Sequence, residues 1–205
     1  MYQPNHYKND SQNFVFNFIQ QFPFATIVLK GNQLLATHVP VLVEGTTNNF
    51  RLFAHIAKHN PMQEFLVDKL EMLLIFKGPD AYVSSSWYSK PEVPTWDYAA
   101  VHINAKIKLQ SDAELQSSLK TLIARFEKTM ENPLHYQDIP NKIWEDNFKG
   151  ITGFWLEPFK IAGIEKLHQG FPKKDVENIS RNLKREGCPM ADLAKLLDKK
   201  HDTNN

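Results

Sequence analysis

The sequence contains a single cysteine, Cys188, among its 205 residues. One thiol cannot form a disulfide within the chain, so we expect a structural thiol and a reducing cytoplasmic compartment. No apolar run approaches the about 20 residues that a membrane-spanning helix needs. The first residues, MYQPNHYKND, have neither the basic nor the apolar region of a secretory signal. We therefore expect a cytoplasmic protein that has no membrane partner.

An excess of one charge sign is also missing. The chain has 24 Lys and Arg against 23 Asp and Glu, which leaves a formal net charge of +1. No strong overall field therefore directs the protein towards nucleic acid or an anionic membrane. The GxSxG, HExxH, CxxC, GxGxxG and P-loop motifs are absent as well. The sequence thus carries no side-chain signature of the enzyme and nucleotide-binding classes that these motifs mark.

The hydrophobic pattern predicts mainly strands, together with several helices. No regular alternation of strand and helix is present, which argues against a doubly wound parallel sheet. We expect a mainly β, α+β fold in which a closed or partly closed barrel carries helices outside. The predicted domains are residues 1–167 and a C-terminal helical extension, 168–205. Strands are expected at 25–45 (two strands around Gly31-Asn32), 48–56, 71–76, 81–85, 98–110 and 151–167, and helices at 11–22, from Asn60 onward, 111–130, around 143–148, 173–186 and 189–200.

Local signals add detail to this pattern. Ser111 and Glu114 have the spacing of a capping box, and Asn60 followed by Pro61 is typical of a helix start, with Gln63 as its capping-box partner. Pro40 predicts an edge strand or a bulge. The residues KGPD, 77–80, predict a turn, and Pro158 predicts a break in the last strand.

The segment HIAKHNP, residues 55–61, leaves a predicted strand and enters a predicted helix. Backbone N–H groups at a helix start favour anions, and Lys58 adds a full positive charge. The segment is therefore a candidate phosphate site. The alternative is an ordinary capped helix start that carries a solvated lysine.

The stretch GPDAYVSSSWYSKPEVPTWDYAAVHI, residues 78–103, is unusually rich in aromatic residues. Rigid rings with polar N–H and O–H groups are suited to a flat pocket for a planar ligand or to a packed dimer interface. Both interpretations hold if the pocket lies between subunits. The serines between the rings are expected to serve turns or caps. The aromatic residues are Tyr82, Trp87, Tyr88, Trp96 and Tyr98.

Two further patterns have competing interpretations. His55 and His59 have a metal-ligand spacing, and His38 and His102 lie on other predicted strands, but ordinary hydrogen bonding within a sheet explains such histidines equally. The C-terminal helix pair, residues 166–205, carries nine Lys and Arg against six Asp and Glu. Its short junction is similar to a helix-turn-helix. Its leucines and isoleucines would serve equally as an apolar face packed on the body.

Four motifs occur in an order and spacing that resemble the PaiB family of FMN-binding negative transcriptional regulators. They are ATHVPV (36–41), HIAKHNP (55–61), GPDAYVSSSWY (78–88) and VPTWDYAAVH (93–102), and the resemblance continues through ITGFWLEP and KLHQG. It implies an FMN-binding split β-barrel that acts as a homodimer with FMN between subunits. It also implies that Lys58 and Asn60 hold the phosphate. The other residues implied at the FMN site are His38 and Pro40 near the flavin ring, Trp87, Tyr88, Thr95 and Trp96 closing the pocket from the partner subunit, and His55.

The sequence departs from the family pattern at two places. Asp80 stands in the GPDAYVS motif where the family has histidine, and His168 to Phe171 replace a segment that ends in arginine. The resemblance implies an FMN-binding regulator that acts on DNA directly or indirectly. Three alternatives stay open: a flavin oxidoreductase, a ligand-free dimeric module, and a haem-binding or haem-degrading protein. The histidines available to a haem iron are His38, His55, His102 and His168.

Overall fold

The computed structural model describes residues 1–186 and 190–202. The predicted junction at Gly187 and Cys188 lies outside these residues. The helices are α1 (Gln12–Gln21), α2 (Asp112–Glu127), α3 (Asn141–Lys149), α4 (Lys173–Glu186) and α5 (Met190–Asp202). The strands are β1 (Phe24–Lys30), β2 (Leu34–Pro40), β3 (Leu42–Thr46), β4 (Asn49–Ala57), β5 (Glu71–Val83), β6 (Thr95–Leu109) and β7 (Ile151–Lys166). Three short 3-10 helices are η1 (Pro61–Phe65), η2 (Ser85–Trp87) and η3 (Tyr136–Asp138).

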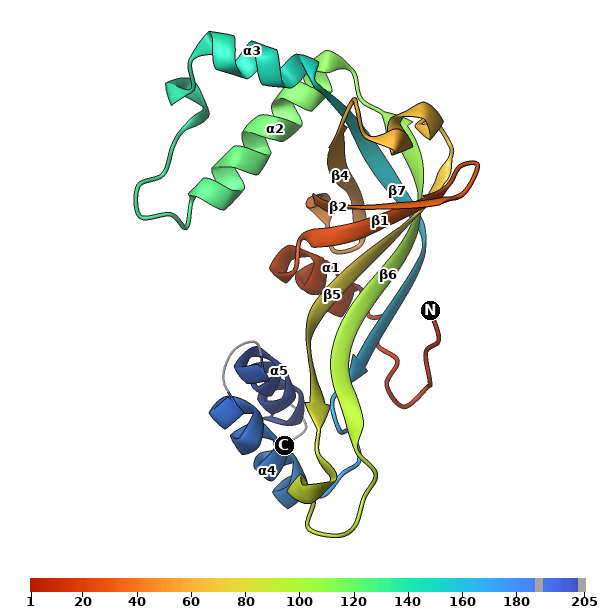
Figure 1. The fold of residues 1–205 in the computed structure, drawn as a ribbon, viewed down its shortest axis with the longest axis vertical. Helices are drawn as coiled ribbons and strands as arrows, with labels where there is room; N and C mark the ends of the chain where they lie inside the picture. The colour runs from red at the N-terminus through yellow and green to blue at the C-terminus, as the bar shows by residue number, and fades with distance from the viewer. Residues whose placement is uncertain (187–189, 203–205) are drawn as a thin grey trace. The chain divides into compact units, whose positions relative to one another are not determined.

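The strands form one seven-stranded sheet in the order β2-β1-β5-β6-β7-β4-β3 (Figure 1). The pairs β1–β2, β1–β5, β3–β4 and β4–β7 are antiparallel. β2 also approaches β4, although several strands separate the two in the sheet order. The sheet therefore curls into a partly closed barrel, and the predicted α+β split barrel with outer helices is confirmed.

The chain divides into two compact units. The helical unit consists of Met1–Phe18, Phe76–His102 and Ile161–Asn205, and the barrel unit consists of Ile19–Ile75 and Ile103–Lys160. β5, β6 and β7 each contribute residues to both units. The boundary predicted between residues 167 and 168 falls inside the helical unit. No helix among the described residues is long and apolar enough to cross a membrane.

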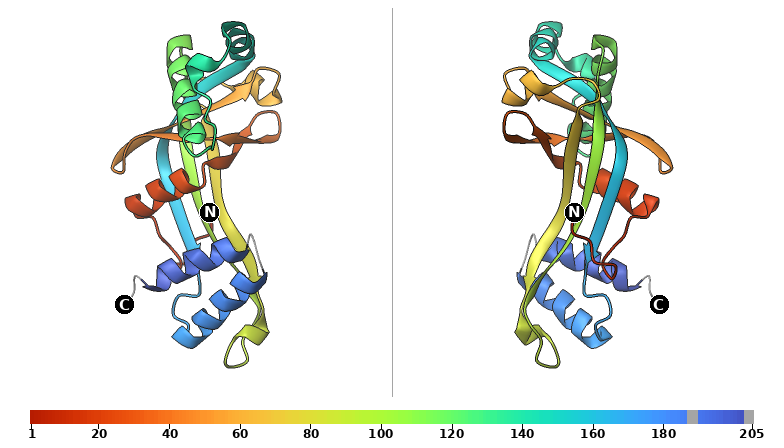
Figure 2. Two further views of the ribbon diagram at one scale, coloured as in Figure 1. Left: turned by 90° about the vertical axis from the view of Figure 1, so that its left-hand side faces the viewer. Right: turned by 90° about the vertical axis from the view of Figure 1, so that its right-hand side faces the viewer.

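The C-terminal helices bury their apolar faces in the helical unit. α4 and α5 lie side by side (Figure 2). They pack on Ala81 and Val83 of β5 and on Leu167. The apolar residues of the helix pair thus form a core, as one of the two sequence interpretations predicted. Those buried from the helices are Val176, Ile179, Leu183, Leu193, Ala194 and Leu197.

The core of the barrel unit follows the predicted alternation of β6. Ile103, Ala105 and Ile107 are buried, whereas Lys106 and Lys108 are exposed. α2 covers one part of the sheet, where Leu115 and Leu119 pack with residues of β3, β4 and β7. The capping box between Ser111 and Glu114 is present and confirms the predicted start of α2.

Two predicted breaks are wrong. β5 runs without interruption through residues 77–80, where Gly78 takes a buried position in the alternation and an added Cβ would meet the Phe18 ring at 3.0 Å. β7 runs through Pro158, which lies beyond Leu156, the last β7 residue paired with β4. The missing N–H of Pro158 therefore interrupts no hydrogen bond of that ladder. Pro40 ends β2, which is an edge strand as predicted.

The local geometry after β1 and after β4 differs from a tight two-residue turn and from an α-helix start. The Gly31-Asn32 turn is a three-residue loop, since Lys30 pairs with Leu34. Asn60 does cap the segment after β4, but that segment is the five-residue 3-10 helix η1. The side chain of Gln63 forms no capping box, and its Oε1 is buried without a hydrogen-bond partner among the described residues.

Candidate functional site

Protein acceptors bind backbone N–H groups of the HIAKHNP segment after β4. The Lys58 N–H donates to the carbonyl oxygen of Gly150 at 2.8 Å, and the Asn60 N–H donates to that of Ala57 at 2.9 Å. The Asn60 side chain accepts the Met62 N–H at 2.9 Å. These N–H groups are therefore occupied by protein acceptors. The Lys58 side chain is exposed and has no carboxylate within ion-pair distance among the described residues, so its ammonium is the group that a phosphate could use.

The structure brings the THVP and AKHNP motifs together in the barrel unit. A long hydrogen bond of 3.5 Å joins the Asn60 side-chain amide to Thr37 Oγ1 of β2. His38 follows Thr37 on the same edge strand, where its Nδ1 lies 3.0 Å from Thr26 Oγ1 and its ring stacks on Phe24. Two motifs that are about 20 residues apart in the sequence thus form one surface region.

His55 lies on β4 and stacks on Phe53, with ring centroids 5.8 Å apart. Burial lowers its pKa below the usual value for histidine. Its Nδ1 is buried and has no hydrogen-bond partner among the described residues. His55 is therefore a neutral imidazole near neutral pH.

The aromatic residues of the 78–103 stretch have two different environments in the helical unit. Trp87 and Tyr88 are half-buried and pack against the core that α4 and α5 form. Trp96 is 55% exposed and lies edge-on to Tyr82, which is 44% exposed. Ser84 caps η2 by accepting the Ser86 N–H, so the predicted capping duty of a serine is confirmed. Within this stretch, Trp96 and Tyr82 are the exposed aromatic residues.

A buried hydrogen-bonded chain joins Asp97, His168 and Tyr88 in the helical unit. His168 Nδ1 contacts Asp97 Oδ2, and His168 Nε2 lies 2.6 Å from the Tyr88 hydroxyl. Asp97 is 0% exposed and His168 is 2% exposed. Sequence reasoning missed Asp97, although a signal was present. Asp97 is an even number of residues from Val101, so the two side chains lie on the same face of β6. The alternation therefore places a carboxylate on the buried face.

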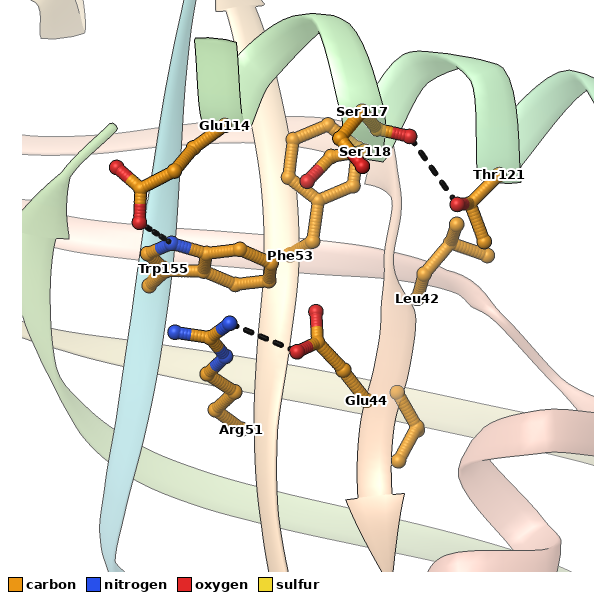
Figure 3. Close-up of a pocket in the computed structure, with 10 residues that line it drawn as sticks. Leu42, Glu44, Arg51, Phe53, Glu114, Ser117, Ser118, Thr121 and Trp155 are labelled. Atoms are coloured by element: carbon orange, nitrogen blue, oxygen red, sulfur yellow. Dashed lines mark hydrogen bonds and ion pairs between the residues drawn. The ribbon is translucent and has the colours of Figure 1, made fainter. Parts of the chain in front are cut away.

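A further cavity of about 380 Å³ lies in the barrel unit between α2 and strands β3, β4 and β7 (Figure 3). The Arg51 guanidinium lies flat on the Trp155 ring, 3.6 Å from its centroid, and pairs with Glu44 at 2.7 Å. Glu114 accepts the Trp155 indole N–H at 3.0 Å. Hydrogen bonds from the Ser111 backbone, the Trp155 indole and the Ser111 hydroxyl lower the pKa of Glu114 to about 2. Glu114 therefore lines this cavity as an anion at neutral pH.

No three His, Cys, Asp or Glu side chains gather as metal ligands within residues 1–186 and 190–202. Both ring nitrogens of His168 are hydrogen-bonded, so in this arrangement neither is free for a haem iron. Burial lowers the pKa of His102, which is half-buried on β6.

Residues 1–158 match the protein family described as "Putative FMN-binding domain". The chain belongs to this family. The protease synthase and sporulation protein PAI 2 of Bacillus subtilis is 33% identical over 202 residues, which make up 98% of this chain and 98% of that protein. The resemblance of the four motifs to the PaiB family is thereby confirmed.

Solved structures show the same fold at low sequence identity. The FAD and heme binding protein from Mycobacterium smegmatis has a TM-score of 0.59 at 16% identity, covering 85% of this chain and 79% of that one. The flavocytochrome Anf3 from Azotobacter vinelandii has a TM-score of 0.59 at 13% identity, covering 86% of this chain and 78% of that one. At these identities the likeness concerns the fold alone.

The residues implied for FMN by the family fall into both units. His38, Pro40, His55, Lys58 and Asn60 lie in the barrel unit, and Trp87, Tyr88, Thr95 and Trp96 lie in the helical unit. The exposed Lys58 ammonium suits a phosphate, and the exposed Trp96 ring suits a planar ligand. The Lys58 ammonium and the Trp96 ring are thus each accessible to a ligand, whereas the backbone N–H groups beside Lys58 are already occupied.

Proposed function

We propose that the protein is an FMN-binding regulator of transcription of the PaiB type. The observation that carries this proposal is the 33% identity to the Bacillus subtilis protein along 98% of both chains. The match to the FMN-binding family over residues 1–158 supports the choice of cofactor. We place the protein in the cytoplasm.

The proposed FMN site uses two sets of residues. Lys58 holds the phosphate by its charge, and Asn60 keeps the turn that presents Lys58 in place by capping η1. His38, Pro40 and His55 face the flavin ring. Trp87, Tyr88, Thr95 and Trp96 close the pocket from the partner subunit of a homodimer, with the exposed Trp96 giving the largest stacking surface. FMN would supply the redox-active ring, and the protein would bind and orient it.

The proposed link to transcription is direct or indirect contact with DNA. The apolar face of α4 and α5 is buried in the core of the helical unit, so only the outer faces of these helices are available to DNA. Several of their cations are already paired: Lys184 with Asp198, Lys195 with Asp192, and Lys200 with Glu165. These pairs reduce the positive charge offered to phosphates and favour control through a protein partner over direct reading of DNA by the helix pair.

A flavin oxidoreductase is the second candidate. It is favoured by the fold shared with a flavocytochrome and with a protein named for both FAD and heme. Such an enzyme would pass electrons from a reduced nicotinamide to a small acceptor and would need no DNA.

The test is a titration of the purified apoprotein with FMN and, separately, with haemin. Saturable quenching of flavin fluorescence is expected, together with a dimer by light scattering. Binding to promoter DNA that falls steeply with salt then supports the regulator, whereas turnover of a reduced nicotinamide supports the oxidoreductase. A Soret band with haemin and no flavin binding would replace FMN by haem. If neither ligand binds, the cofactor part of the proposal is wrong.

A further inference from the structure

A cavity of about 150 Å³ lies in the helical unit, where β6 begins and β7 ends. It has room for several waters or one small organic molecule. Its walls combine aromatic rings with charged groups. The rings are those of Tyr7, Tyr88 and Phe171, and the charged groups are Glu92, Asp97 and Lys166.

One carboxylate oxygen on this wall lacks a donor. Asp97 is 0% exposed, and its Oδ2 is bonded to His168. Its Oδ1 is buried and has no hydrogen-bond partner among the described residues. Buried carboxylate oxygens are stable when they accept hydrogen bonds. A hydrogen-bond donor bound in the cavity would therefore satisfy Asp97 Oδ1.

The one ammonium on the wall does not neutralise Asp97. Lys166 Nζ donates to Thr95 Oγ1 and to the carbonyl oxygen of Trp96 at 2.6 Å, which are neutral acceptors. Two carboxyl groups, those of Glu92 and Asp97, line the cavity with one ammonium, so acidic groups outnumber lysines on this wall. Consistent with this excess of acidic groups, burial followed by the charges of Asp97, Glu92 and Asp175 raises the pKa of Tyr88 to about 12.

We propose that this cavity binds a small protonated amine. An N–H of the ammonium group donates to Asp97 Oδ1, and its alkyl body packs among the rings of Tyr7, Tyr88 and Phe171. Aromatic rings attract cations through their negative faces, and a nearby carboxylate adds charge and a directed hydrogen bond. The same negative charge disfavours an anion such as a phosphate or a carboxylate.

The amine site does not depend on the proposed flavin site. It shares Tyr88 and Thr95 with the set that closes the flavin pocket, but its recognition group is Asp97, which belongs to neither set of proposed flavin contacts. Titrating the apoprotein with an amine in the absence of FMN, and with FMN in a separate experiment, lets either proposal fail without the other.

The test compares three probes of equal length that differ in charge: n-propylammonium, 1-propanol and propionate. The apoprotein is titrated with each, and amide chemical shifts are followed by NMR. Propylammonium is expected to shift resonances around Asp97 and Phe171 saturably, with at least tenfold higher affinity than propanol, and propionate is expected to leave them unchanged. Equal affinity for propylammonium and propanol would show a merely apolar hollow, and no binding of any probe would also overturn the proposal.

Variants separate the two contributions. Asp97→Asn keeps the shape and removes the charge, so it should abolish the preference for the ammonium probe. Phe171→Leu keeps an apolar wall and removes one ring, so affinity should fall about two- to fivefold. Phe159→Leu, at an exposed ring in the barrel unit, is the matched control and should bind as the parent does. Asp97→Asn could fail to fold. In that case, unchanged propylammonium affinity in Phe171→Leu contradicts the role of the ring, and the three-probe comparison on the parent chain tests the role of the negative charge.

Discussion

The Tyr88 hydroxyl lies 2.6 Å from His168 Nε2, although 80 residues separate them in the chain. Because Asp97 occupies the other imidazole nitrogen, His168 joins the residues after β5, the start of β6 and the residues after β7. His168 also has a left-handed backbone, with φ of +55°, which is uncommon for a residue with a Cβ. His168 is thus the centre of a buried polar chain.

Replacing His168 with alanine should strongly destabilise the protein. The substitution leaves the fully buried Asp97 without its hydrogen-bond partner, and stranding a buried polar group in this way costs roughly 1–3 kcal/mol, and more for a charged group. The free energy of unfolding from urea denaturation measures the loss. His168→Ala combined with Asp97→Ala should cost less than the sum of the two single changes, because the double variant has no stranded polar group. Strict additivity would show that the two side chains are not coupled.

Tyr88 should be the last tyrosine to ionise in the folded protein. Burial and the neighbouring carboxylates raise its pKa from 10.0 to about 12. The folded state therefore favours the neutral phenol, a contribution to stability that is complete below pH 10 and is lost as the pH rises through about 12. Ultraviolet absorbance of tyrosinate during an alkaline titration follows this step. Tyr88→Phe should remove the latest component, and its persistence in that variant would assign it to another residue.

Glu114 should make the protein sensitive to acid. Its pKa is lowered from 4.5 to about 2, so its stabilising contribution is present above pH 4.5 and is lost as the pH falls towards 2. Glu114→Gln should be less stable at neutral pH and should lose less of its stability across that interval. Urea midpoints measured at several pH values test this. An unchanged dependence of stability on acid pH in Glu114→Gln would exclude Glu114 as the source.

Ser111→Ala removes a hydroxyl donor to Glu114 and should lower the free energy of unfolding by about 1 kcal/mol through loss of the helix cap.

Lys58→Ala should weaken FMN binding and leave the fold intact. Lys58 is exposed, and lone surface charges contribute little to stability. The dissociation constant for FMN, measured by quenching of flavin fluorescence, should rise at least tenfold at low salt. Lys30→Ala, at an exposed lysine that ends β1 in the same unit, is the control for loss of one positive charge. Equal effects of the two changes would indicate general electrostatics rather than a phosphate contact.

Local structure followed from the sequence wherever neighbouring residues carry the signal. The Ser111–Glu114 capping box forms between residues three apart, and the alternation of β6 depends on side chains that point in turn to opposite faces. The four motifs also identified the family, because their combination and spacing are specific along one chain. The sequence therefore determined the class of fold, most of the elements and the family.

Tertiary packing decided the points where distant residues meet. Residues 77–80 have turn chemistry, yet β5 continues through them, and Gly78 lies buried close to the Phe18 ring. The N–H groups around Lys58 looked available to a phosphate, but the chain closes on them after β4, in part through Gly150. The Tyr88–His168–Asp97 chain needs three segments brought together by folding. A local sequence pattern cannot predict such contacts, because the interacting residues are far apart in the chain and nothing in the sequence around each one identifies its partner.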